Sequence, residues 1–246
     1  MRPHNSLVHS RTRVTDRYAL LPLEGFPFSR LPNWPGADVR ILATPSLGAN
    51  FAEYLIDLPA GGRGNFGAAD GIETFFYVTS GTGLFEGVPL AAGSFGLLPP
   101  AAPAAFEATE KLSVLVVRKR FQPAVGVPIF EPIINHERRV PSTPWADTYK
   151  IQLQMLIPDE LQFDLAVNIF AFTPGFGLPI VETHVMEHGA LILQGKGIYQ
   201  LGGEWMEVEK DDFIWMGPFC PQSFYATGEQ PAKYIYTKDV NREIVL

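Results

Sequence analysis

The chain has 246 residues, of which 46% are hydrophobic and 18% charged, so it can bury one large or two ordinary cores and is not disordered. A formal net charge of −7 offers no basic face to a phosphate backbone, which argues against a nucleic-acid partner. The single cysteine, Cys220, excludes an internal disulfide and a thiolate metal cluster.

The sequence gives no sign of a targeting or membrane segment. Residues Met1–Arg17 carry charges without the apolar run of a secretory signal, and no stretch approaches about 20 consecutive apolar residues. We therefore expect a soluble, cytoplasmic protein with no membrane partner.

The predicted elements divide the chain into four segments. Residues 1–37 are expected to form an N-terminal arm, because they begin with charged residues and no apolar run. Residues 38–120 form a run of short strands, rich in aromatic and β-branched residues, with turn signals between them. Residues 121–149 are rich in proline and uneven in pattern, which predicts a linker. Residues 150–246 then return to short strands.

The two strand-rich segments resemble each other. Glu73–Gly83 and Glu187–Gly197 each begin with an acidic residue, continue through an apolar strand and end in Gly-x-Gly. Upstream, Phe51–Gly61 and Phe163–Gly175 are alternating strands that close on proline and glycine. We interpret the chain as a duplicated all-β protein of sandwich or barrel type. The alternative is one irregular β domain in which the internal sequence similarity is coincidental.

A candidate metal site lies in the second repeat. Glu182 and His184 are two residues apart, so on a strand they share a face, and a turn after His184 can bring His188 into the same space. Imidazole nitrogen with carboxylate oxygen suits a divalent ion such as Mn, Fe, Co, Ni or Zn. Two alternatives stay open: a zinc-binding helix carrying His-x-x-x-His, against which Gly177 and Pro179 argue, and polar residues with no ligand role.

These residues resemble the first conserved motif of the cupin superfamily, which reads His-x-His, then Glu, then Gly. The residues that carry the resemblance are Gly177, Glu182, His184, His188 and Gly195. The usual ligand set is permuted here, and Gln222 stands where the second cupin motif has its His. The resemblance implies two tandem cupin barrels, of the double-stranded β-helix or jelly-roll type. It also implies one metal ion per chain, for which the neutral Gln222 oxygen favours Mn²⁺.

The first repeat lacks the corresponding ligands. By the repeat, Ala68, Asp70 and Thr74 match Glu182, His184 and His188, while Ala104 falls near the position of Gln222. One carboxylate and one threonine hold a transition metal poorly. Residues 38–120 are therefore expected to be a cupin without metal ligands, and residues 150–246 the metal-binding one.

Almost the whole chain resembles the (S)-ureidoglycine aminohydrolase family, whose members are manganese enzymes of purine breakdown with two cupin barrels. The segments that carry this resemblance are Gly71–Phe75, Glu182–His184, Glu187–Gly189, Gly197–Tyr199 and Tyr234–Arg242. The metal positions show no departure, whereas the arm and linker do.

That resemblance implies a small-molecule substrate, (S)-ureidoglycine, which is converted with water into (S)-ureidoglycolate and ammonia. It implies that Tyr199, Tyr234 and Lys238 bind the substrate, that Lys238 and Glu182 take part in catalysis, and that the protein is a homo-oligomer. Other functions stay open: a metal-dependent dioxygenase, an isomerase acting on a small carboxylate, or a binding cupin without activity.

Overall fold

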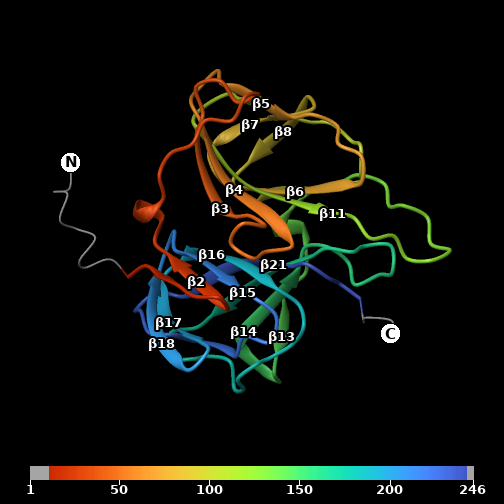
Figure 1. The fold of residues 1–246 in the computed structure, drawn as a ribbon. Coiled ribbons are helices and arrows are strands. Elements are labelled where there is room, and N and C mark those ends of the chain that lie inside the picture. The colour runs from red at the N-terminus through yellow and green to blue at the C-terminus, as the bar shows by residue number, and fades with distance from the viewer. Residues whose placement is uncertain (1–10, 243–246) are drawn as a thin grey trace. The chain divides into compact units, whose positions relative to one another are not determined.

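The structure is a computed structural model that describes residues 11–242 (Figure 1). The regular elements of this part are strands, apart from two short 3-10 turns at Leu23–Gly25 and Glu137–Arg139. No described helix is long and apolar enough to cross a membrane. The all-β prediction is therefore confirmed.

The chain divides into two compact units, each assembled from separate segments. Among the described residues, the N-terminal unit consists of Phe28–Pro141, Gln154–Val167 and residues 238–242. The C-terminal unit consists of residues 11–27 together with Ser142–Leu153 and Asn168–Thr237.

The N-terminal unit is built on a six-stranded and a four-stranded antiparallel sheet. The six strands, in spatial order, are β12 (Ile133–His136), β9 (Ser94–Leu98), β6 (Ile72–Ser80), β11 (Leu112–Arg120), β4 (Phe51–Leu58) and β3 (Asp38–Ala43). The four strands are β5 (Arg63–Phe66), β10 (Ala104–Ala108), β7 (Thr82–Phe85) and β8 (Val88–Ala91).

Aromatic side chains fill the core of this unit. Phe76, Phe85 and Phe106 have ring centroids 4.6 to 5.1 Å apart, and Trp34 lies 5.0 Å from Phe66. All five are buried. Each fully buried ring of this size contributes roughly 1.5–3 kcal/mol to the hydrophobic stabilisation of the unit.

The eight-stranded sheet carries most of the C-terminal unit. Its strands, in order, are β1 (Arg13–Val14), β2 (Tyr18–Leu21), β19 (Phe213–Met216), β16 (His188–Gln194), β21 (Ala232–Lys238), β15 (Ala166–Phe172), β14 (Thr148–Met155) and β13 (Thr143–Trp145). A three-stranded sheet completes the unit, with the order β18 (Glu204–Glu209), β17 (Lys196–Leu201) and β20 (Gln222–Ala226).

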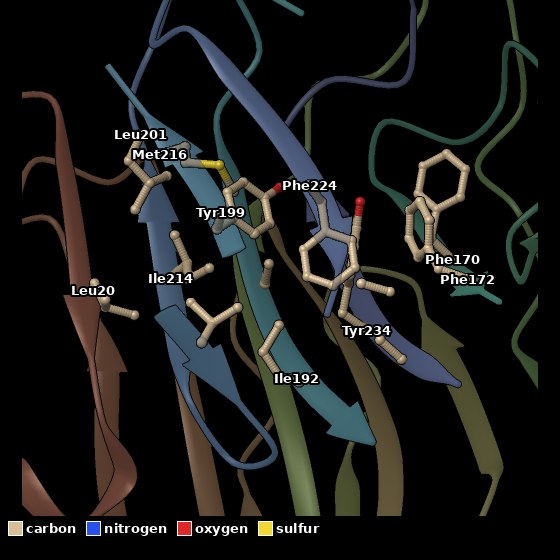
Figure 2. Packing of buried hydrophobic residues seen from close by; sticks show 14 of the residues in the cluster. Leu20, Phe170, Phe172, Ile192, Tyr199, Leu201, Ile214, Met216, Phe224 and Tyr234 are labelled. Atoms are coloured by element: carbon tan, nitrogen blue, oxygen red, sulfur yellow. The ribbon is translucent and has the colours of Figure 1, made fainter. Parts of the chain in front are cut away.

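The core of the C-terminal unit mixes apolar side chains with buried tyrosines. Figure 2 shows Tyr199 and Tyr234 among aliphatic and phenylalanine side chains such as Ile192 and Phe224. Both tyrosines are only 3% exposed. A buried hydroxyl needs a hydrogen-bond partner, so these residues mark a place where polar groups enter the core.

Two glycines show that the backbone repeats itself. Gly81 (φ +84°) and Gly195 (φ +73°) both have left-handed conformations, and an added Cβ would lie 1.8 Å from the Lys111 carbonyl oxygen or 2.6 Å from that of Pro231. Only glycine tolerates both the left-handed φ and the close approach of a carbonyl oxygen. The match aligns Leu112 with Ala232, and hence Arg118 with Lys238.

Strand register extends the alignment to the other sheets. Phe85 pairs with Phe106 in the N-terminal unit as Tyr199 pairs with Phe224 in the C-terminal unit. Ala104, two residues before Phe106, therefore corresponds to Gln222.

The segments expected as arm and linker also contribute strands. β1 and β2 lie within residues 1–37, and β2 pairs with β19. β12 and β13 lie within residues 121–149 and join two different sheets. The domain limits 38–120 and 150–246 remain predictions about the repeats, whereas the compact units are interleaved along the chain.

Candidate metal centre

Three predicted ligands meet in the C-terminal unit. His188 begins β16, Gln222 begins β20, and His184 lies in the loop before β16. The Nε2 atom of His184 lies 3.0 Å from Nε2 of His188 and 2.9 Å from the Gln222 amide nitrogen. The side chains of these three residues therefore converge on one point.

The backbone fixes the tautomer of both histidines. Nδ1 of His188 lies 2.8 Å from the Thr237 carbonyl oxygen, and Nδ1 of His184 lies 3.0 Å from that of Met186. A carbonyl can only accept, so both Nδ1 atoms carry the proton. In neutral rings both Nε2 atoms then present lone pairs, as metal-binding histidines do.

Two lone pairs 3.0 Å apart repel each other unless a cation or a proton lies between them. Nitrogen ligands bound about 2.1 Å from a metal, at right angles to each other, are about 3 Å apart. The observed spacing of the imidazoles thus fits two neighbouring positions around one divalent ion.

Backbone hydrogen bonds place Glu182 beside Gln222. It forms an isolated bridge with Gln222, in which each amide donates to the other residue's carbonyl at 2.8 and 2.9 Å. Directly paired residues on antiparallel strands project side chains to the same face. Within residues 11–242, however, no three His, Cys, Asp or Glu side chains are gathered as a ready metal site. The Glu182 carboxylate is therefore a proposed ligand beside two imidazoles and an amide.

A chain of buried hydroxyls leads to Gln222. The Tyr199 hydroxyl donates to Oε1 of Gln222 at 3.4 Å, and the Tyr199 and Tyr234 side chains are hydrogen-bonded to each other. The two tyrosine rings have centroids 6.0 Å apart. Tyr199 thus contacts the candidate ligand Gln222 directly, and Tyr234 lies beside Tyr199.

Burial and the nearby Glu182 carboxylate keep these tyrosines uncharged. Burial raises the pKa of both Tyr199 and Tyr234 above the ordinary value, and the Glu182 carboxylate adds to the increase. Since a phenolate is disfavoured, each side chain keeps its proton and can donate a hydrogen bond.

Sequence reasoning did not single out Tyr236. Its ring stands perpendicular to that of His188 with centroids 5.1 Å apart, and its hydroxyl accepts from the Asn168 amide at 3.1 Å. Burial raises its pKa to about 12. The strand period could have revealed it, because Tyr236 lies two residues after Tyr234. No local sequence pattern indicated that Asn168 or the Thr237 carbonyl would contact the candidate site.

Lys238 is the last residue of β21 and is partly buried. Strand alternation puts it on the same face of β21 as Tyr234 and Tyr236. The structure therefore brings His184, His188 and Gln222 together with Tyr199 and Tyr234. Lys238 lies at the end of the strand that carries Tyr234.

In the N-terminal unit, Asp70 and Thr74 take the positions of His184 and His188 in the sequence repeat, and the other corresponding positions are apolar. Register pairs Phe66 with Ala104 as Glu182 pairs with Gln222, so Phe66 takes the ladder position of Glu182. A constant offset along the sequence had matched Ala68 with Glu182. The offset fails because the segment before Glu182 is longer than the one before Phe66. Phe85, Val114 and Val116 correspond to Tyr199, Tyr234 and Tyr236, and all three are buried.

Comparisons with known proteins bear on the family and the fold. A cupin domain family model matches residues 168–238. The (S)-ureidoglycine aminohydrolase of Escherichia coli (strain K12) is 35% identical over 237 residues, which cover 92% of this chain and 90% of that protein.

Solved structures share the fold. A putative glyoxylate induced protein from Pseudomonas aeruginosa has a TM-score of 0.87 and 30% identity, covering 100% of this chain and 96% of that one. Bacillus subtilis oxalate decarboxylase, described with Mn(II) centres, has a TM-score of 0.70 and 10% identity, covering 99% and 85%. The latter likeness concerns the fold alone. The prediction of two tandem cupin barrels is confirmed, and the chain belongs to the (S)-ureidoglycine aminohydrolase family of the cupin superfamily.

Proposed function

We propose that the chain hydrolyses (S)-ureidoglycine to (S)-ureidoglycolate and ammonia, a step of purine breakdown, with one Mn²⁺ held by Glu182, His184, His188 and Gln222. The family relationship supports the reaction, because the curated relatives are named for it. The observation that supports the metal centre best is the pair of imidazole Nε2 atoms 3.0 Å apart, each with its Nδ1 bonded to a carbonyl.

The donor set favours a hard to borderline divalent ion. Two imidazoles, one carboxylate and one amide oxygen suit Mn²⁺ better than a thiolate-preferring metal. Turning the Gln222 amide over would present its oxygen to the ion. The bound ion would supply positive charge that polarises and orients the substrate. Because Glu182 contributes one negative charge against two positive ones, the site would stay cationic and attract the substrate carboxylate.

The tyrosines would bind and orient the substrate. Tyr199 and Tyr234 keep their protons, so their hydroxyls can donate to the carboxylate or the ureido oxygen. These hydroxyls come from different strands, β17 and β21, so they would contact the substrate from two directions. Fixing the carboxylate and the ureido group would leave only the amino group on the reacting carbon exposed to exchange with water.

Lys238 would move the protons. In the reaction the bond from carbon to the amino nitrogen breaks and a bond to a water oxygen forms, so one proton must leave the water and one must reach the leaving nitrogen. Lys238 Nζ is our candidate for this transfer. The internal repeat supports an orientation of the Lys238 side chain toward Glu182. Arg118, the counterpart of Lys238 in the N-terminal unit, lies over Phe66 with 4.7 Å to the ring centroid. Phe66 in turn holds the ladder position of Glu182.

Isotope labelling separates this proposal from a cupin dioxygenase or isomerase. In H₂¹⁸O, hydrolysis should place one ¹⁸O in the product hydroxyl and release one ammonia per turnover. The label should depend on Mn²⁺ and vanish with chelator. Oxygen derived from O₂, or a product isomeric with the substrate, would replace the proposal with one of the alternatives.

A further inference from the structure

The turn after β19 contains a strained residue. Phe219 has φ +56°, in the left-handed region, and its side chain is 58% exposed. Such a conformation costs a residue other than glycine about 1 kcal/mol or more, and it persists only where surrounding contacts hold it. The ring is too exposed to contribute much packing, so the backbone contacts of Phe219 must account for the conformation.

Those contacts lead directly to a candidate metal ligand. The Phe219 amide donates to the His184 carbonyl oxygen at 2.7 Å. The Phe219 carbonyl in turn accepts from the Arg17 guanidinium, also at 2.7 Å. Phe219 therefore links the loop that carries His184 to the N-terminal hairpin.

The hairpin is itself well anchored in the C-terminal unit. The Gly217 amide donates to the Arg17 carbonyl at 2.8 Å, and Tyr18 pairs with Met216 in the sheet. Arg11 adds two hydrogen bonds to the buried Asp212 carboxylate. Because hydrogen bonds hold Phe219 at both its amide and its carbonyl, the turn can keep its strained conformation.

We propose that Phe219 is a positioning residue for the metal centre: Arg17 holds it in a left-handed turn, and its amide fixes the loop that carries His184. The inference rests on the metal centre of the proposed function. Groups behind a metal ligand typically change metal affinity by about 10- to 100-fold. Arg17 acts one step further away and is exposed, so its effect should be smaller.

Metal titration of full-length variants tests this without an activity assay. Chelator-stripped protein is titrated with Mn²⁺, and free Mn²⁺ is followed by electron paramagnetic resonance. Arg17→Met should weaken binding about 3- to 10-fold. Arg13→Met is the matched control, because Arg13 lies in the same hairpin and donates to its neighbour's carbonyl, that of Thr12. Arg17→Lys keeps a donor and should recover most of the affinity.

Two changes at Phe219 separate backbone from side chain. Phe219→Gly keeps the amide and tolerates the left-handed conformation, so Mn²⁺ affinity should stay within about twofold of wild type. Replacing the Phe219 amide with an ester removes only the donor to His184 and should weaken binding about 10- to 100-fold, more than Arg17→Met does. This ester variant decides the matter if Arg17→Met does not fold.

The outcomes separate two failures. Wild-type protein that binds no Mn²⁺ would refute the metal centre itself. Wild-type binding with unchanged affinity in the ester variant, or a loss in Phe219→Gly as large as in Arg17→Met, would overturn the positioning role alone.

Discussion

At the scale of single residues, hydrogen bonds to main-chain carbonyls orient the two histidines of the candidate metal centre. The Thr237 and Met186 carbonyls bind the protonated Nδ1 atoms, and the two Nε2 atoms face each other. Tyr236 packs edge-on against the His188 ring. If the proposed metal binds here, the imidazoles would need little rearrangement, which would lower the entropic cost of forming the site.

Removing either imidazole should abolish metal binding. His184→Ala and His188→Ala each leave too few good donors, so purified protein should contain far less than one Mn²⁺ per chain. His136→Ala is the control, because His136 lies on β12 in the N-terminal unit. Elemental analysis measures the content, and full occupancy in His188→Ala would contradict the assigned ligands.

Replacing the lysine at the end of β21 should affect turnover and not metal content. Lys238→Met should lower kcat by about 10²-fold or more, the usual loss on removing a general acid or base. Lys196→Met, at an exposed position on β17, should leave kcat unchanged. A wild-type rate in Lys238→Met would exclude Lys238 from proton transfer.

A buried carboxyl in the N-terminal unit should make stability depend on pH. Glu53 is fully buried, its oxygens have no hydrogen-bond partner among the described residues, and burial raises its pKa from 4.5 to about 8. Above pH 4.5 the unfolded chain loses this proton while the folded chain keeps it. Glu53 therefore makes the free energy of unfolding decrease as pH rises toward 8, by at most about 1.4 kcal/mol per pH unit.

Glu53→Gln should remove that dependence. Its stability relative to wild type, from urea unfolding, should increase between pH 5 and pH 8 and then level off. Glu107→Gln, at a partly exposed position paired with Arg63, is the control. A difference between wild type and Glu53→Gln that does not change with pH would show that Glu53 ionises normally in the folded protein.

At the scale of elements, the repeat depends on two tight turns. Gly195→Ala should destabilise the C-terminal unit by about 2–4 kcal/mol, because the added methyl group meets the Pro231 carbonyl in a left-handed turn. Gly175→Ala shares a positive φ of +80° but meets only the Tyr225 hydroxyl at 3.9 Å, so about 1 kcal/mol is expected. Equal losses by urea unfolding would mean that the close approach to Pro231 is not important.

The strands and the grouping of His184, His188 and Gln222 could be predicted because their signals are local or repeated. Alternation marked β4, and Gly-x-Gly aligned the two repeats well enough to match Ala104 with Gln222. The strands within 121–149 escaped prediction because prolines mask short edge strands. The Phe66 match to Glu182 also escaped, since loop lengths before the two positions differ and only hydrogen-bond register reveals it. Contacts such as the Thr237 carbonyl on His188 depend on tertiary structure.

At the scale of the whole molecule, two similar folds carry different chemistry. The C-terminal unit places imidazoles, an amide and phenols where the N-terminal unit has Thr74, Ala104 and apolar side chains. Buried side chains such as Phe66 and Phe85 fill these positions in the N-terminal unit, so we expect that unit to be stable without metal. Self-association into a homo-oligomer stays a prediction, which sedimentation of the full chain would test.

Ammonia release is the most direct test of the central claim, that this chain is a metal-dependent aminohydrolase. Chelator-stripped protein is given freshly generated (S)-ureidoglycine with and without Mn²⁺, beside His188→Ala treated in the same way. We predict that Mn²⁺ restores ammonia release well above the spontaneous rate in the wild type and not in His188→Ala. Ammonia at the spontaneous rate from the Mn²⁺-loaded wild type, or equal release from both proteins, would contradict the account.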